Sequence, residues 1–142
     1  MMEGFDEKLK KMNSVVRILI IEDDEEMRAL MKDCLMEEGT ETDSARDGCE
    51  AYQKLIEESF DLVITDIQMP GLTGLDILPV IRKIQPQASI IVMTAFGSEE
   101  VRRKSFARGA TTYLEKPFAF ERLKTLIQEI VSAKGKDEGQ RI

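Results

Sequence analysis

The chain has 142 residues, of which 42% are hydrophobic, enough for one domain with its own core and too few for two of ordinary size. A formal net charge of −7 without any lysine- or arginine-rich block excludes the usual basic surface for nucleic acid, and no apolar run is long enough to span a membrane. The absence of histidine excludes histidine bases, imidazole metal sites and Ser-His or Cys-His nucleophile pairs, which leaves carboxylates, hydroxyls, lysine and oxygen-bound metals.

Both ends of the chain are polar. The N-terminal stretch, MMEGFDEKLKKMNS, mixes acids with lysines and lacks the apolar core of a signal peptide. We expect residues 1–14 to be a tail that is disordered or forms a short helix, with three apolar residues on one face: Phe5, Leu9 and Met12. The sequence predicts a single domain over 15–133 and a second polar tail over 134–142.

Five segments have the composition of strands. Three of them, at 18–21, 62–65 and 89–93, are rich in Ile, Leu, Val and Met, as is typical of strands covered on both faces. The second segment, ETDSA, is polar and is expected at an edge of the sheet. The predicted strands are Arg17–Ile21, Glu41–Ala45, Asp61–Thr65, Ser89–Met93 and Thr111–Glu115.

Helical patterns alternate with these strands. Apolar residues recur with the 3.6-residue period of a helix over 27–35, 51–56 and 123–131. Ser98 is placed to cap a fourth helix, and Gly39 and Gly109 lie where helices are expected to end. Pro79, within GLDILPVIRKI, predicts a late start or a kink in the third helix, because proline has no amide hydrogen to donate.

The two cysteines, Cys34 and Cys49, have neither metal-ligand nor redox spacing. We interpret them as reduced thiols, which favours a cytoplasmic location for the protein.

Strand–helix alternation over most of the chain indicates an α/β fold with a doubly wound parallel sheet. Ligands of such sheets bind beyond the carboxyl ends of the strands. The residues at those ends are Glu22 and Asp23 after the first strand, Asp66 after the third, Thr94 after the fourth and Lys116 after the fifth. We therefore expect several carboxylates, a hydroxyl and an ammonium group on one rim of the sheet.

Each of these residues also has an ordinary structural role open to it. The acids Asp24–Glu26 are placed to cap the helix that follows the first strand, and we assign them that role. Asp66 precedes a Pro-Gly turn, Thr94 is suited to a cap or a turn, and a lysine such as Lys116 is usually solvated. Their coincidence at the carboxyl ends of strands favours a functional site.

The chemistry that fits this set is phosphoryl transfer. Clustered carboxylates suit a hard cation such as Mg²⁺, and an aspartate can act as a nucleophile and form an acyl phosphate. Phosphoryl transfer requires mainly positioning and neutralisation of oxygen charge, which a metal, a lysine and a hydroxyl supply. The acidic block after a buried strand is costly, because like charges about 4 Å apart repel by roughly 4 kcal/mol at a dielectric near 20. A bound cation, together with a phosphoryl group that completes the site, would make this block tolerable.

Four motifs carry a resemblance to a known family: ILIIEDDEEMR, DLVITDIQMPGLTGLDIL, IIVMTAFGS and GATTYLEKPF. In order and spacing they resemble the receiver domains of two-component response regulators, of the kind found in chemotaxis and sporulation regulators, over about residues 17–131. The resemblance implies a flavodoxin-like (βα)5 fold with a five-stranded parallel sheet in the order 2-1-3-4-5.

The resemblance also implies a metal site beside the phosphoacceptor. Asp66 would accept the phosphoryl group, and Glu22 and Asp23 would be the paired acids, with Asp23 the direct metal ligand. Asp66 and the backbone carbonyl of Gln68 would complete the protein's share of the shell around Mg²⁺, or Mn²⁺ in its place.

Further residues take their roles from the same resemblance. Thr94 and Lys116 would contact the phosphoryl group, and Tyr113 would be the aromatic residue that switches together with Thr94. The side chains of Gln68 and Phe96 would flank the approach of water and set the lifetime of the acyl phosphate.

The implied function is a switch that receives a phosphoryl group from a sensor histidine kinase or a histidine phosphotransfer protein. It would signal to a downstream protein through the face formed by the fourth helix, the fifth strand and the last helix. It would catalyse only its own phosphotransfer and a slow self-dephosphorylation. The acidic strand-five residue and charged last helix of DNA-binding members are replaced by Thr111, Thr112 and FERLKTLIQEI, so we do not expect their dimer.

Several alternatives stay open. Only SAKGKDEGQRI follows the matched region, which fits a stand-alone receiver, a phosphorelay intermediate or part of a larger transcriptional regulator. An aspartate-nucleophile phosphatase would want a second aspartate at the position of Gln68. A flavin or nucleotide carrier would meet repulsion from Glu22–Glu26. A degenerate receiver that serves only as a scaffold is disfavoured because every key position is filled.

Overall fold

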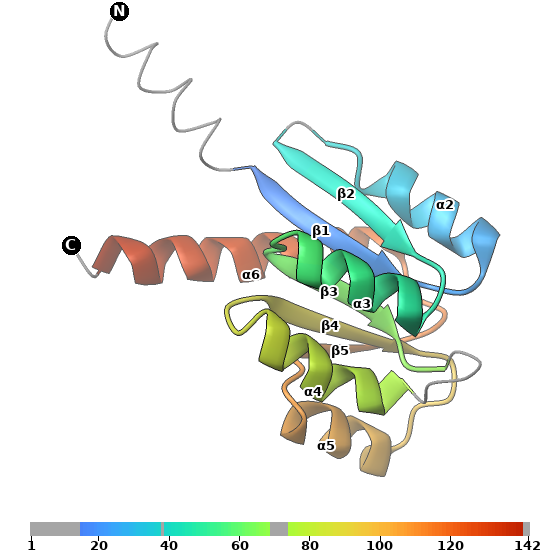
Figure 1. Ribbon diagram of the computed structural model, residues 1–142. Coiled ribbons are helices and arrows are strands. Elements are labelled where there is room, and N and C mark those ends of the chain that lie inside the picture. The colour runs from blue at the N-terminus through green and yellow to red at the C-terminus, as the bar shows by residue number, and fades with distance from the viewer. Residues whose placement is uncertain (1–14, 38, 69–73, 141–142) are drawn as a thin grey trace, which may run out of the picture.

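The computed structural model describes residues 15–37, 39–68 and 74–140, with only the backbone described for 135–140. One parallel sheet of five strands has the order β2-β1-β3-β4-β5 (Figure 1), which confirms the predicted α/β class and strand order. The strands are β1 Val16–Ile21, β2 Thr40–Ala45, β3 Leu62–Asp66, β4 Ser89–Thr94 and β5 Thr112–Glu115. The helices are α2 Glu25–Cys34, α3 Gly48–Glu57, α4 Gly74–Ile84, α5 Glu99–Ala107 and α6 Phe120–Gln140.

The sheet is covered on both faces, and alternate residues of the inner strands point into two separate cores. Leu19 and Ile21 of β1 lie in the core beneath α3 and α4, against which α5 also packs through Val101. Ile18 and Ile20 point the other way, into the core shared with α2 and α6. Because both faces are buried, β3 and β4 contain no exposed residue at all.

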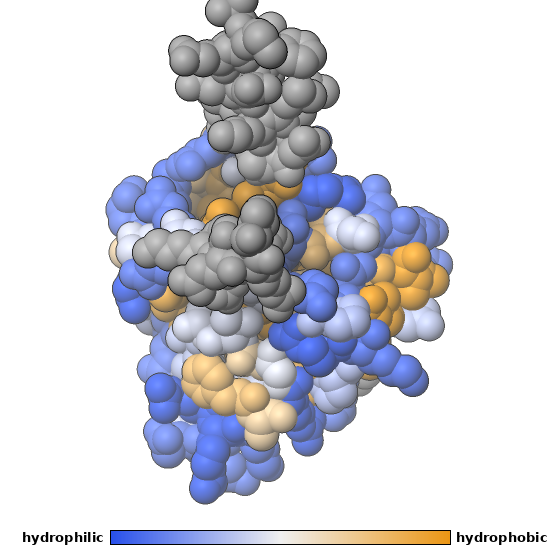
Figure 2. All heavy atoms as spheres, turned by 90° about the vertical axis from the view of Figure 1, so that its left-hand side faces the viewer, coloured by the Kyte–Doolittle hydropathy of each residue, from blue (hydrophilic) through white to orange (hydrophobic). Residues whose placement is uncertain are grey.

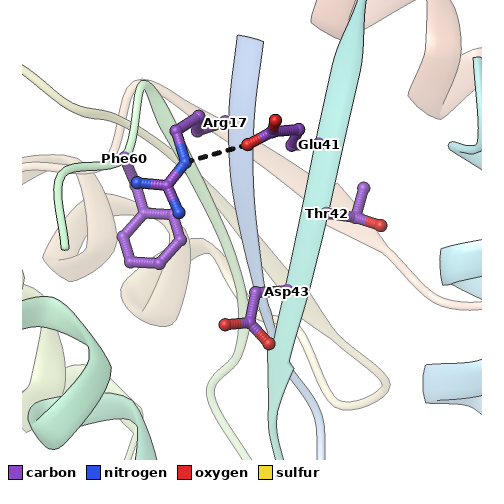
Figure 3. A pocket seen from close by; sticks show the side chains of 5 residues that line it. All are labelled: Arg17, Glu41, Thr42, Asp43 and Phe60. Carbon is purple, nitrogen blue, oxygen red and sulfur yellow. Dashed lines mark ion pairs between the residues drawn. The ribbon is translucent and has the colours of Figure 1, made fainter. Parts of the chain in front are cut away.

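The polar strand β2 lies at the edge of the sheet, as its composition predicts. Lys54 of α3 pairs with Asp43 of β2 at 2.7 Å. Arg17 of β1 pairs with Glu41 of β2 at 3.4 Å, and its guanidinium carbon lies 5.1 Å from the ring centroid of Phe60 (Figure 3). These pairs replace apolar packing along a strand that is only partly covered.

The strands begin at the end of the molecule that faces the viewer in Figure 2. The described surface there is mostly hydrophilic, and its hydrophobic side chains lie in separate patches. Among the residues that the structure describes, none of the helices combines the length and the apolar character that a membrane crossing requires.

The predicted helix caps are mostly confirmed. The carboxylate of Asp24 accepts hydrogen bonds from the amides of Glu26 and Met27, and the hydroxyl of Ser98 accepts one from Val101. Gly109 directly follows the C-cap of α5 with a φ of 111°. The prediction for Gly39 was wrong, because α2 ends at Cys34 and this glycine, at φ 84°, lies in the turn before β2.

For the third helix the sequence predicted a late start or a kink; the late start was wrong, and the kink stays a prediction. Helix α4 begins at Gly74, and Pro79 lies inside it. The amide of Gly74 donates to the carbonyl of Ile67 at 2.9 Å, and a Cβ on Gly74 would lie 1.9 Å from the Ile67 Cα, so only glycine allows this close approach. Burial of Ile77 and Leu78 before and beside the proline offsets the hydrogen bond that Pro79 cannot donate.

Helix α6 extends beyond 123–131, the residues that carry its apolar helical pattern. It continues past 131 to Gln140, so the predicted boundary between domain and polar tail at 133–134 falls inside a helix. The ammonium of Lys134 donates to the carbonyls of Asp61 and Gln87 at 3.1 and 2.6 Å, which anchors this part of the helix beside the starts of β3 and β4. The predicted N-terminal tail, 1–14, lies outside the described residues.

Candidate functional site

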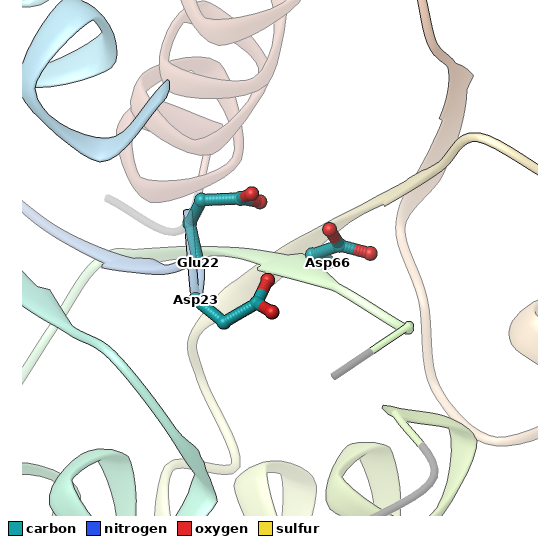
Figure 4. Close-up of side chains that lie close together, drawn as sticks. All are labelled: Glu22, Asp23 and Asp66. Atoms are coloured by element: carbon teal, nitrogen blue, oxygen red, sulfur yellow. The ribbon is translucent and has the colours of Figure 1, made fainter. Parts of the chain in front are cut away.

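Three carboxylates converge where two central strands end. Glu22 and Asp23 directly follow β1, and Asp66 is the last residue of the neighbouring β3. Each of them offers a carboxylate oxygen within 4.8 Å of the others (Figure 4). Glu22 is 1% exposed and Asp66 5%, whereas Asp23 is exposed, so one side of the cluster is open to solvent.

Lys116 brings a positive charge into this cluster from the opposite half of the sheet. Its amide donates to the carbonyl of Thr94 at 2.8 Å, which continues the pairing of β5 with β4. Its ammonium lies 2.9 Å from Asp66 Oδ2 and 3.1 Å from Glu22 Oε2. The side chain is 15% exposed, so this lysine is not the solvated surface lysine of the alternative interpretation.

Burial and mutual charge shift the ionisation of these groups. The pKa of Glu22 is raised to about 7, mainly by burial and then by the charge of Asp66, while Lys116 opposes both effects. Burial alone would lower the pKa of Lys116, but its hydrogen bonds and attraction to Asp66 and Glu22 outweigh that effect and raise it. The lysine is therefore a fixed positive charge in a site with an excess of acid.

Asp66 has the predicted role in the turn after β3, and its second oxygen lies within the cluster. Its Oδ1 accepts a hydrogen bond from the amide of Gln68 at 2.8 Å, which forms the turn after β3, and its Oδ2 faces Lys116. The carboxylate is thus fixed at both oxygens. The proposed metal contact of the Gln68 carbonyl stays a prediction.

Thr94 is fully buried at the end of β4, beside the strand that carries Asp66. Its Oγ1 accepts a hydrogen bond from the amide of Phe96 at 3.1 Å, which confirms a role in the turn and leaves its hydrogen free to be donated. Phe96 follows on the rim, and its side chain is 76% exposed.

Tyr113 of β5 packs against the core beneath α3 and α4. Its hydroxyl is buried and finds no hydrogen-bond partner among the residues that the structure describes. It lies over Gly97, where an added Cβ would be 2.1 Å from the hydroxyl oxygen. Burial raises the pKa of this hydroxyl, and the charge of Glu115 adds to the effect. The hydroxyl therefore occupies a space that exists only because residue 97 has no side chain.

One residue of the site was missed by sequence reasoning. Arg28, in the first part of α2, donates from Nη1 to the backbone carbonyl of Glu22 at 2.9 Å. It ties the helix back to the turn that carries Glu22 and Asp23. An arginine soon after an acidic block was the available signal, but it does not distinguish a backbone contact from a surface ion pair.

Comparison with known proteins gives a consistent result. The family model of the response regulator receiver domain matches residues 18–128. The sporulation initiation phosphotransferase F of Bacillus subtilis (strain 168) is 30% identical over 118 residues, which cover 83% of this chain and 95% of that protein. Other relatives are longer: the chain is 34% identical to response regulator MprA of Mycobacterium sp. (strain KMS) over 87% of its own length, but spans only 54% of that protein.

Solved structures agree with this comparison. A CheY-like response regulator receiver domain protein from Methanospirillum hungatei JF-1 has a TM-score of 0.83 and 31% identity, with 87% of this chain and 99% of that chain covered. A response regulator from Burkholderia pseudomallei, solved with a phosphorylated aspartic acid, a calcium ion and citrate, has a TM-score of 0.76 and 25% identity. That match covers 89% of this chain and 74% of the other.

Proposed function

The chain belongs to the response regulator receiver domain family, and on that premise we propose that Asp66 is its phosphoacceptor and that a partner histidine kinase is the donor. The observation that carries the proposal is the position of Asp66, buried at the end of a central strand with Lys116 2.9 Å from one oxygen and two further acids beside it. Because these 142 residues contain no histidine, the donor group must lie outside this sequence.

The transfer needs only this chain, the donor and solvent. A carboxylate oxygen of Asp66 attacks the phosphorus of a phosphohistidine; the new P–O bond forms as the P–N bond breaks, and the released imidazole nitrogen takes up a proton from solvent. Lys116 neutralises charge on the phosphoryl oxygens, and the buried hydroxyl of Thr94 donates a hydrogen bond to them once they are present. The fixed orientation of Asp66 keeps its carboxylate ready for attack.

The cluster of acids suits Mg²⁺, or Mn²⁺ in its place. It offers only carboxylate oxygens, the ligands of hard cations, and one side of it is open for the water molecules that Mg²⁺ retains. We propose that Asp23, Asp66 and the carbonyl of Gln68 are direct ligands, with Glu22 beside them. A bound cation would neutralise charge that spreads over the phosphoryl oxygens during transfer.

The test of the proposal is phosphotransfer to the purified chain. With Mg²⁺, acetyl phosphate should add the mass of one phosphoryl group, and at least one autophosphorylated histidine kinase or histidine phosphotransfer protein of the host should transfer its label. Failure of every donor would contradict the proposal. Steady hydrolysis of phosphate esters without a stable labelled form would instead support the aspartate-nucleophile phosphatase, which the sequence disfavours because Gln68 stands where the second acid is needed.

Removal of the metal should expose the repulsion between the acids. Asp23→Asn is expected to raise the melting temperature in EDTA by roughly 2–4 °C, because about 1 kcal/mol shifts a chain of this size by that amount. Mg²⁺ at ten times its dissociation constant should stabilise the unmodified chain by roughly 1.4 kcal/mol and the variant by much less. Thermal denaturation with and without Mg²⁺ measures both effects.

Asp24→Asn is the matched control for this experiment. It removes a neighbouring charge, and asparagine caps a helix as well as aspartate does, so its response to Mg²⁺ should equal that of the unmodified chain. If Asp23→Asn and the control respond alike, Asp23 is not a ligand.

We propose that the output face consists of α5, β5 and α6. If the Thr94 hydroxyl moves toward a phosphoryl group, it leaves space into which the ring of Tyr113, on the adjacent strand, can turn. Amide hydrogen exchange should therefore change over 98–108 and 111–116 after phosphorylation. Changes confined to α2 and α3 would contradict this assignment.

The lifetime of the acyl phosphate is expected to be long. Neither Gln68 nor the exposed, apolar Phe96 can activate water at neutral pH. The double variant Gln68→Asn, Phe96→Glu should lose its phosphoryl group about tenfold faster, a change that needs only about 1.4 kcal/mol of barrier. Intact mass followed over time in Mg²⁺, after removal of the donor, measures both rates, and equal rates would show that these positions do not set the lifetime.

A further inference from the structure

A hollow of about 420 Å³ lies between α3 and α4, away from the acidic site and from the proposed output face. Its lining is mainly apolar and includes Cys49, Tyr52, Gln53, Leu55, Ile77 and Val80. The α3 side continues as an exposed stripe, because Tyr52 is 50% exposed, Ile56 is 55% exposed and Cys49 is open to solvent. Helix faces with such spacing normally lie against another element.

The chain enters the sheet beside the C-terminal end of α3, one of the two helices that line this hollow. Arg17 donates from Nη1 to the carbonyl of Ser59 at 2.9 Å, and its Nη2 lies 3.5 Å from Glu58, the C-cap of α3. Arg17, close to the first described residue, therefore lies next to the C-terminal end of α3, at the end of the molecule where the strands begin (Figure 1). A segment that turns back from this point onto the hollow runs in the same direction as α3.

The first 14 residues have the length and the pattern to cover the hollow. If twelve residues of this segment formed a helix, that helix would be about 18 Å long. Helix α3, with ten residues, is about 15 Å long, so the segment could cover its whole length. The apolar residues Phe5, Leu9 and Met12 share one face of a helix and span seven positions, as do Cys49, Tyr52 and Ile56 on α3. Along a helix axis, the three residues of the segment and the three residues of α3 each extend over about 10 Å, so parallel packing would bring the two sets into contact.

We propose that the hollow between α3 and α4 is the docking site of the chain's own N-terminal segment, whose apolar face, Phe5, Leu9 and Met12, covers Cys49, Tyr52 and Ile56. The occupant is this segment because it joins the domain at the C-terminal end of α3, is long enough to reach and cover the hollow, and carries apolar residues over the same seven positions. The contact does not depend on phosphorylation, so its failure would leave the proposed function untouched.

The thiol of Cys49 reports on the covering directly. In the full chain carrying Cys34→Ala, only Cys49 can react with a maleimide. Serine at all three apolar positions, Phe5, Leu9 and Met12, should raise the rate of this reaction about tenfold, the effect of uncovering a thiol that is exposed only in a minor open state. A rate within about twofold of the parent's would overturn the proposal.

The control variant carries Glu7→Ser and Lys10→Ser, which lie on the other side of the segment's helical pattern and together leave its net charge unchanged. Its rate should equal that of the parent. If the parent's protection falls on dilution, the occupant is a second copy of the chain, and the proposal is likewise overturned.

A second measurement approaches the contact from α3. Trypsin should cleave the segment at its lysines about tenfold faster in Ile56→Ser than in the unmodified chain, because a docked helix resists cleavage. Leu30→Ser is the matched control: Leu30 is equally aliphatic and 53% exposed, but it lies on α2, on the other face of the sheet. Equal cleavage of the two variants would contradict docking against α3.

Discussion

Asp66→Asn is expected to abolish phosphorylation by acetyl phosphate and by any partner kinase. Asparagine has nearly the same shape and can keep the contact with the amide of Gln68, but its neutral amide oxygen is too weak a nucleophile to form a stable acyl phosphate. Intact mass after incubation with donor and Mg²⁺ measures the effect: the unmodified chain should gain one phosphoryl group and the variant none.

Asp24→Asn serves as the control, since it changes an exposed acid of the same acidic block that caps α2 instead of entering the cluster. It should be labelled as completely as the unmodified chain. Equal labelling of Asp66→Asn would move the phosphoacceptor to another acid, and a loss of label in both variants would indicate a general effect of charge on donor binding.

Lys116→Met is expected to cause the largest loss of stability of any single change at the site. Among the described residues, the lysine is the cation that pairs with the carboxylates of Glu22 and Asp66, whose side chains are 2% and 7% exposed. Removing one partner of a buried ion pair typically costs about 3 kcal/mol, because the remaining charge is buried without compensation. Urea denaturation in EDTA should show this loss, and Mg²⁺ should recover part of it by neutralising the same acids.

Lys124→Met provides the comparison. Lys124 pairs with Glu37 at 3.5 Å, but the two side chains are 32% and 54% exposed, so the loss should stay within about 1 kcal/mol. Adding Glu22→Gln to Lys116→Met should restore stability, because one of the unpaired charges is removed. If both lysine variants lose the same stability, burial of the Lys116 pair has no energetic consequence.

The residues found from the sequence are those whose position follows from strand order alone. The apolar runs define β1, β3 and β4, and the parallel arrangement then brings Glu22, Asp66 and Lys116 to one rim whatever the details of packing. The polar composition of β2 is sufficient to place it at the edge.

The features that were missed depend on contacts between side chains and backbone that no local pattern encodes. The start of α4 is decided by the close approach of Gly74 to Ile67, which outweighs the local preference of Pro79. The extension of α6 is anchored by Lys134 at the carbonyls of two distant strand starts. The bond from Arg28 to the carbonyl of Glu22 required knowledge of how α2 packs on β1.

The contact between Lys116 and Glu22 joins residues 94 positions apart, and β5 is the last strand of the sheet to be synthesised. A ribosome-bound chain that has released β1 to β4 already has both buried acids but not the ammonium that balances them. Such an intermediate is less stable than the finished domain and lacks a group required for phosphoryl transfer. On the proposed function, competence to accept a phosphoryl group would therefore arrive only together with the completed fold.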